Sequence, residues 1–144
     1  MGNTPRNTEH ASLTVANDPR AIEQAQGTVI DAAERLGYPK ASVFALRLAL
    51  HEAMTNAFKH GHRDLPASVP VTLRYTATPE TIDLTIVDRG PGFNVQDVPD
   101  PTTDENLERG SGRGLLLIRA YMSTVEYNAS GNALHMVYKR PAGK

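Results

Sequence analysis

The sequence predicts an α+β fold in which strands that pair mostly antiparallel carry helices on one face. Two stretches in the first half repeat apolar residues at helical spacing, whereas several others alternate between apolar and polar residues as strands do. Short turns join these strands into two hairpins, one in the middle of the chain and one near its end. The resulting order, β-α-α-β-β-α-β-β, lacks the strict alternation of a doubly wound parallel fold.

Composition is that of an ordinary globular protein. The 144 residues are 40% apolar and 22% charged, which suits one domain with a proper core. The net charge of -1 argues against general nucleic-acid binding, and the lack of cysteine excludes disulfides and thiolate zinc sites. Neither a membrane-spanning run nor a signal peptide is evident, so we expect a cytoplasmic protein without membrane association. Residues 1–11 are expected to be flexible and residues 12–140 to form the domain.

The first elements are a short strand and a helix. Residues 12–16 alternate and predict the strand. Asp18 provides an N-cap with Pro19 at the first helical position, and Gly37 marks the end of the helix. The apolar stripe of this helix consists of Ile22, Ala25, Val29, Ala32, Ala33 and Leu36.

The next elements are a second helix and a hairpin. The helix is predicted from near Pro39 to about His60, with Gly61 as its stop. Residues 71–78 and 81–88 alternate and are separated by two residues, which predicts an antiparallel pair. The core positions expected on the helix are Val43, Leu46, Leu50, Ala53, Met54 and Ala57.

The rest of the chain is expected to form a long connection, a helix and a closing hairpin. Residues 89–114 are rich in Gly, Pro, Asp and Thr, and connections of this length are usually functional or mobile. Within them, residues 94–112 offer few apolar anchors and predict a mobile lid. A helix is predicted over residues 113–121, and the stretches TVEYNA and ALHMVYKR then form the hairpin.

Three glycines, Gly110, Gly112 and Gly114, lie just before and at the start of the predicted third helix. Their pattern matches neither a Walker loop, which ends in Lys followed by Ser or Thr, nor the dinucleotide fingerprint G-x-G-x-x-G. From this stretch alone a phosphate-binding turn, a hinge and an ordinary surface loop are all open. Unpaired N–H groups at a helix N-terminus favour an anion, and Arg113 opposes the helix dipole unless it meets one.

A second cluster joins a carboxylate to a tight turn. Asp88 ends a predicted strand ahead of Gly90 and Gly92, so an acceptor stands beside a backbone that a flat ring can approach. Such an acceptor suits an exocyclic amino group. A strand followed by Asp-x-Gly is also a common turn, so this pattern alone is weakly specific.

A third cluster lies on the second helix. Glu52 and Asn56 are four residues apart and share a face, with Lys59 and His60 one turn further. The solvated edge of an amphipathic helix has the same spacing. The sequence HEAMT opens like a zinc-protease motif, but Thr55 stands in place of the second histidine, and that interpretation is rejected.

The order and spacing of the three clusters resemble the GHKL, or Bergerat-fold, ATPase superfamily. Within it, LRLALHEAMTNAFKHG, DRGPGF and DPTTDENLERGSGRGLLLIRAYM are most similar to the anti-sigma factor serine/threonine kinases of bacterial partner-switching systems. The resemblance runs from about Ser12 to Arg140. It implies an α/β sandwich with helices on one face of a mixed sheet, and a nucleotide between the helical layer and a lid.

The resemblance also implies roles for individual residues. Glu52 would act as general base, Asn56 would hold the Mg²⁺ that bridges the phosphates of ATP, and Asp88 would accept from the adenine amino group. One family feature is missing, because the last strand offers no hydroxyl residue in register to support the adenine. The further residues implied at the nucleotide are Gly90 and Gly92 at the base, Gly110, Gly112, Arg113 and Gly114 at the phosphates, and Lys59 and His60 nearby.

Three functions are compatible with these residues. The resemblance implies a homodimeric anti-sigma factor and serine kinase, which sequesters a sigma factor and phosphorylates an anti-anti-sigma antagonist of the STAS type. An ATP-hydrolysing switch without a protein acceptor is one alternative. A binding module whose surface is only stabilised by nucleotide is another. The kinase is favoured because the residues for phosphoryl transfer are all present.

Overall fold

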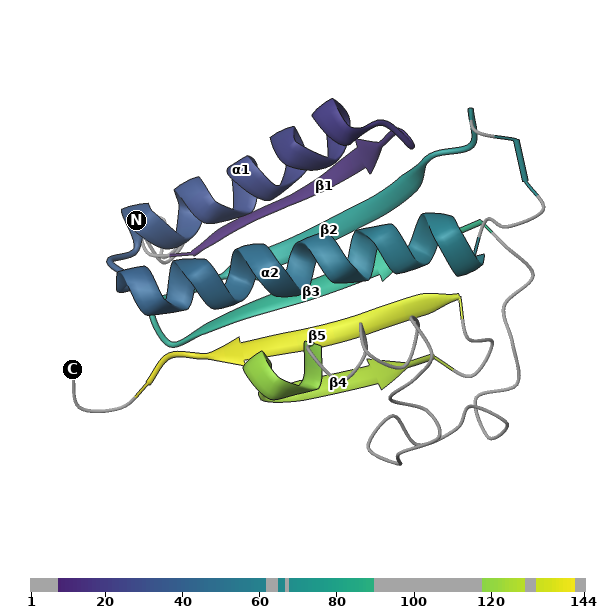
Figure 1. Ribbon diagram of the computed structural model, residues 1–144. Coiled ribbons are helices and arrows are strands. Elements are labelled where there is room, and N and C mark those ends of the chain that lie inside the picture. Colours follow the sequence, from purple (N-terminus) through teal and green to yellow (C-terminus); the bar gives the residue numbers. More distant parts are fainter. Residues whose placement is uncertain (1–7, 62–64, 67, 90–117, 129–131, 142–144) are drawn as a thin grey trace, which may run out of the picture.

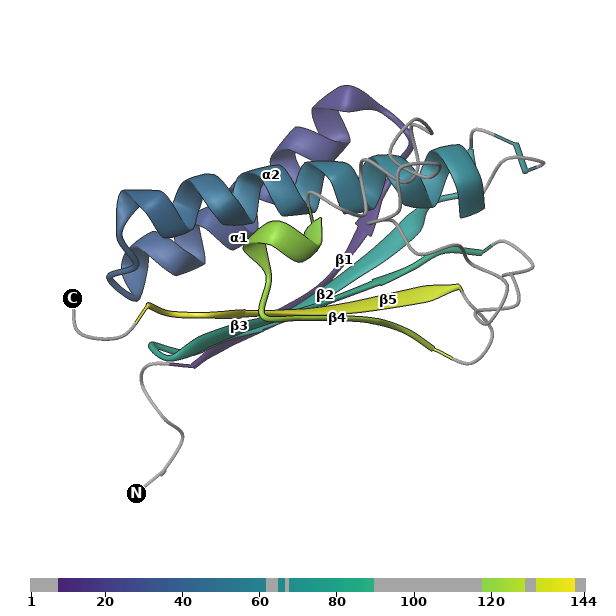
Figure 2. The ribbon, with the colours of Figure 1, turned by 60° about the horizontal axis from the view of Figure 1, so that its bottom comes forward.

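Two layers make up the described part of the chain, a five-stranded sheet and the helices on one of its faces (Figure 2). The computed structural model describes residues 8–61, 65–66, 68–89, 118–128 and 132–141. The elements in chain order are β1 (Glu9–Val15), α1 (Pro19–Arg35), α2 (Lys40–Asn56), the π-helical turn η1 (Ala57–Gly61), β2 (Val71–Ala77), β3 (Thr81–Val87), β4 (Thr124–Tyr127) and β5 (Ala133–Lys139). A short helical turn over residues 118–121 precedes β4. This order confirms the predicted α+β arrangement.

The strands lie in the order β1-β2-β3-β5-β4. All four neighbouring pairs are antiparallel, so the parallel pair that a mixed sheet would contain does not occur among these strands. The reason is the position of β5, which lies between β3 and β4 and runs opposite to both. Both predicted hairpins, β2–β3 and β4–β5, are confirmed.

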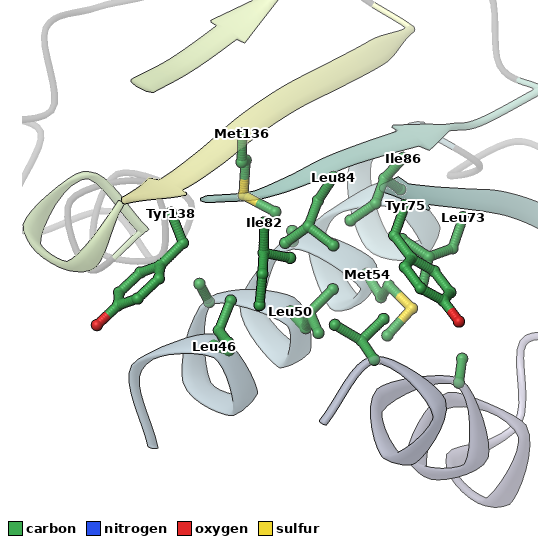
Figure 3. Close-up of a cluster of buried hydrophobic side chains, with 14 of the residues drawn as sticks. Leu46, Leu50, Met54, Leu73, Tyr75, Ile82, Leu84, Ile86, Met136 and Tyr138 are labelled. Carbon is green, nitrogen blue, oxygen red and sulfur yellow. The ribbon is translucent and has the colours of Figure 1, made fainter. Parts of the chain in front are cut away.

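The core lies between the helices and one face of the sheet (Figure 3). Alternate residues of β2, β3 and β5 are buried toward the helices, as the period of a strand requires. On α2, Leu46, Leu50 and Met54 are fully buried against them. The sheet residues that line this core include Leu73, Tyr75, Ile82, Leu84, Ile86, Met136 and Tyr138.

The N-terminal elements match the prediction with one difference. Asp18 caps α1, with its side chain accepting from the amide of Arg20, and Pro19 is the first helical residue. Gly37 ends the helix with φ of 84°, a left-handed conformation that glycine adopts without strain. The strand extends from Glu9 to Val15 and not from Ser12 to Ala16, because residues 9–11 continue the pairing with β2, which ends at Val15.

The second helix is both shorter and more deeply buried than its pattern predicts. Regular α-helix ends at Asn56, and the rest of the predicted span forms the π-helical turn η1. Of the expected core positions Val43 is only partly buried, while the other five are buried. Three further small residues, Ser42, Ala45 and Ala49, are buried as well. Their short side chains let the helix approach the sheet closely.

The third predicted helix falls partly outside the described residues. Residues 118–121 are helical, as expected, and residues 90–117, which include most of the predicted connection and the lid, lie outside the description. In the described ranges, no helix combines the length and the apolarity needed to cross a membrane.

Candidate nucleotide site

Three elements that contain predicted site residues or border them end on the same side of the domain. In Figure 1, α2, β3 and β4 all terminate at the right-hand end, where β5 begins. Asn56 is the last residue of α2, and Asp88 directly follows β3. The topology therefore brings the predicted metal ligand and the predicted base acceptor to one end of the two layers, although they are far apart in sequence.

On α2, Glu52 and Asn56 lie one turn apart and are both partly buried. The alanines that follow each of them, Ala53 and Ala57, are buried in the core. This pattern fixes the two polar side chains at the border between core and solvent, where they can meet a ligand while anchored by a buried neighbour.

The π-helical turn alters the helix geometry directly after Asn56. The backbone amide of Ala57 is shared between the carbonyls of Ala53 and Met54, and the chain then widens into η1. Lys59 is exposed on this turn, and the backbone of His60 also belongs to it. The α-helical spacing that predicts a common face with Asn56 therefore does not extend to Lys59 and His60. Such turns recur at functional sites.

Asp88 is fixed through its backbone. Its amide donates a 2.9 Å hydrogen bond to the carbonyl of Asn132, one residue beyond the last β3–β5 pair, Val87 with Ala133. The carboxylate lies in the electrostatic environment of a phenol: burial raises the pKa of Tyr127, the Asp88 charge raises it further, and Arg119 lowers it. An anionic acceptor, a phenol and a guanidinium thus share this region.

Tyr127 was not identified from the sequence pattern. That pattern was searched for a hydroxyl residue in the last strand, whereas Tyr127 lies on the strand before it. It ends β4 and is half-buried on the side of the sheet that faces the helices, opposite Leu134 of β5. The alternation of TVEY contains the signal, since it places Val125 and Tyr127 on one face. Which face that is depends on the pairing with β5, and the pattern alone does not give it.

The chemistry of these side chains fits an adenine nucleotide with Mg²⁺. A carboxylate accepts from an amino group, and an amide oxygen is a hard ligand of the kind that Mg²⁺ prefers. In the part of the chain that the structure describes, no group of three or more His, Asp or Glu side chains is arranged so that it could hold a metal ion. A Mg²⁺ ion at Asn56 would therefore complete its coordination with phosphate oxygens and water, as is usual for this ion. The predicted site residues outside the described ranges are Gly90, Gly92, Gly110, Gly112, Arg113 and Gly114.

Comparison with known proteins decides the family. Residues 15–138 match the histidine kinase-like ATPase domain, which is most of the chain. The chain belongs to this family. This match and the curated relatives described next together confirm the predicted Bergerat-type fold and the resemblance to anti-sigma factor kinases.

Curated relatives extend over nearly the same region. The serine-protein kinase RsbW of Oceanobacillus iheyensis is 29% identical over 139 residues, which cover 92% of this chain and 87% of the relative. RsbW of Bacillus subtilis is 27% identical, with 90% and 85% covered. The anti-sigma F factor of Anoxybacillus flavithermus is 34% identical over 90 residues, 60% of each chain.

A solved structure agrees with the fold. The crystal structure of the RsbU and RsbW domains of Rv1364c from Mycobacterium tuberculosis matches with a TM-score of 0.61 over 92% of this chain and 32% of that chain. Sequence identity is 12%, so the likeness concerns the arrangement of helices and strands alone.

Proposed function

We propose that the chain is an anti-sigma factor with serine-protein kinase activity that uses Mg²⁺-ATP. The observation that carries the proposal is the meeting of α2 and β3 at one end of a histidine kinase-like ATPase domain, with Glu52 and Asn56 on the helix and Asp88 after the strand. The names of the relatives, serine-protein kinase and anti-sigma factor, support the same assignment.

In this proposal ATP is bound from both ends. Asp88 accepts a hydrogen bond from the adenine amino group, and Gly90 and Gly92 leave room for the ring. Asn56 would hold the Mg²⁺ ion, which would supply positive charge at the phosphates. Gly110, Gly112, Arg113 and Gly114 contact the phosphates from the lid, and Lys59 and His60 lie near them. Residues 12–140 form the nucleotide-binding domain.

The same site serves phosphoryl transfer. Glu52 accepts the proton of the incoming serine hydroxyl as the hydroxyl oxygen bonds to the γ-phosphorus and ADP leaves. Little covalent chemistry is required of the protein, because positioning and charge stabilisation supply most of the rate. Glu52 and Asn56 lie one helical turn apart, which supports separate roles for them, Glu52 as the general base and Asn56 as the metal ligand.

The partners in this proposal are proteins. As a homodimer in the cytoplasm, the chain binds a sigma factor and phosphorylates a serine of an anti-anti-sigma antagonist of the STAS type. Binding of nucleotide strengthens the hold on the sigma factor, and the antagonist competes for an overlapping surface.

Transfer of labelled phosphate tests the proposal. The purified chain is incubated with γ-labelled ATP, Mg²⁺ and the products of neighbouring genes, and phosphoserine is sought on each. We expect one acceptor, and we expect Glu52→Gln to slow transfer by at least about a hundredfold while ATP still binds, as loss of a general base does. Glu23→Gln, an exposed carboxylate on α1, is the matched control with an unchanged rate.

The alternatives predict different products. Release of inorganic phosphate without any phosphoserine would identify an ATP-hydrolysing switch. Binding of ATP without release or transfer of phosphate would identify a nucleotide-dependent binding module. Either result would overturn the kinase assignment.

A further inference from the structure

The side chain of Asn128 ties the end of β4 to the start of β5. Its Oδ1 accepts from the backbone amides of Asn132 at 3.0 Å and Ala133 at 3.1 Å, and its Nδ2 donates to Oδ1 of Asn132 at 2.9 Å. The backbone amide of Asn128 also donates to the carbonyl of Ala133 at 2.9 Å. One asparagine thus holds Asn132, which directly precedes β5, and Ala133, the first residue of β5, by four hydrogen bonds.

Asn132, which Asn128 holds in this way, in turn holds the backbone of Asp88. The carbonyl of Asn132 accepts from the amide of Asp88 at 2.9 Å, so the contacts run from Asn128 through Asn132 to Asp88. Beyond the last β3–β5 pair, this hydrogen bond is what continues the ladder to Asp88. The position of the Asp88 backbone therefore depends on where Asn132 lies.

We propose that Asn128 is a positioning residue for base recognition, which holds Asn132 so that the Asp88 carboxylate is placed to select an adenine amino group. The inference rests on the proposed function, because it takes the ligand to be an adenine nucleotide. A hydrogen bond needs a donor–acceptor distance of about 2.7 to 3.2 Å, so a small displacement of Asp88 is enough to weaken it. Contacts to ribose and phosphates, made elsewhere, would not change.

Positioning and folding have different effects on nucleotide binding. A variant that only destabilises the domain weakens every nucleotide alike. A variant that displaces Asp88 weakens only nucleotides with an amino group at that position. Inosine diphosphate, which has a carbonyl in place of the adenine amino group, is therefore the matched probe for ADP, and neither is consumed by phosphoryl transfer.

The experiment measures the affinity of ADP and IDP by calorimetry for the wild type and three variants. We expect the wild type to prefer ADP, and Asn128→Ala to weaken ADP by about threefold to tenfold, the range for loss of ordinary hydrogen bonds, with IDP unchanged. Asn128→Asp keeps an acceptor for the two backbone amides and should recover most of the preference. Asn17→Ala, at an exposed asparagine between β1 and α1, should match the wild type.

A second readout needs no nucleotide. In the free protein, hydrogen exchange at the Asp88 amide should be several-fold faster in Asn128→Ala than in the wild type, and Asn128→Asp should restore it. The amide of Leu84, in the middle of β3, should exchange at an unchanged rate because its pairing lies away from the turn.

The outcomes distinguish a failure of the positioning role of Asn128 from a failure of the proposed function. Equal weakening of ADP and IDP in Asn128→Ala, or a preference for ADP that survives in it with an unchanged Asp88 amide, would overturn the positioning role while leaving the proposed function intact. A wild type that binds neither nucleotide would overturn the proposed function, and base selection with it.

Discussion

The phenol of Tyr138 donates a 2.7 Å hydrogen bond to Oγ of Ser42 inside the core. Tyr138 belongs to β5 and Ser42 to the first turn of α2, and both side chains are buried. This contact ties the helical layer to the strand nearest the C-terminus, at the end of the domain opposite the candidate nucleotide site (Figure 1). It is a buried hydrogen bond within a largely apolar core.

We expect Tyr138→Phe to lower the free energy of unfolding by about 1 kcal/mol, because the buried Ser42 hydroxyl loses its partner. Combining it with Ser42→Ala should recover part of that loss, since both polar groups are then removed from the core. Urea unfolding of the single and double variants measures the coupling. Tyr121→Phe, at an exposed tyrosine, is the control. Strictly additive effects would show that the two hydroxyls do not interact.

The sequence was informative where structure depends on local pattern. Alternation located the β2–β3 hairpin, and the pair Asp18 and Pro19 located the start of α1. It was uninformative about Ser42, because a serine among apolar residues looks like a break in the core stripe until its partner, 96 positions away, is known. The same holds for Arg140, whose guanidinium donates to the carbonyl of Gly37 at 2.6 Å, 103 positions away.

In the candidate site too, the features that depend on one element could be predicted, and those that depend on strand pairing could not. The spacing of Glu52 and Asn56 and the position of Asp88 at a strand end could be found from sequence, because each depends on one element. Tyr127 and Asn128 could not, because their proximity to Asp88 depends on the pairing of β4 with β5 and of β5 with β3. In TVEYNA they are a strand residue and a turn residue of ordinary type.

We expect Asp88→Asn to weaken ADP and ATP by the same factor, at least about tenfold, since a charged acceptor contributes more than a neutral one and the base is common to both nucleotides. Calorimetry measures both affinities. Asp83→Asn is the matched control: Asp83 lies on β3, the strand that Asp88 follows, but on the face away from the helices, where it contacts His135 at 2.8 Å. Wild-type affinities in Asp88→Asn would exclude this carboxylate from base recognition.

The free energy of unfolding should fall at alkaline pH because the phenol of Tyr38 ionises. Burial raises the pKa of its phenol to about 12, and the neutral hydroxyl donates to the carbonyl of Thr78 at 2.7 Å. Because the folded pKa lies above the unfolded value of about 10, this stabilisation is complete below pH 10 and is lost as pH rises toward 12. Thermal unfolding at pH 9 and pH 11 should show a smaller loss in Tyr38→Phe than in the wild type. Equal losses would contradict the assignment to Tyr38.

The last prediction concerns self-association through β1. This strand is an edge of the sheet and pairs on one side with β2 over seven residues. From His10 to Val15 it contains neither Pro nor Lys, the residues that commonly protect such edges. A second copy can therefore add its own β1 antiparallel across a twofold axis, which is the symmetry of most homodimers.

Light scattering at micromolar concentration measures the mass, which we expect to be twice the 15.6 kDa of one chain. Ser12→Lys places a charge at the centre of this edge and should shift the population toward monomer. Thr124→Lys places the same charge on β4, the opposite edge strand, and should leave the dimer intact. A monomeric wild type, with or without nucleotide, would refute the homodimer. A dimer that Thr124→Lys dissociates and Ser12→Lys does not would move the interface to the β4 edge, where it would lie beside Tyr127 and couple association directly to the nucleotide site.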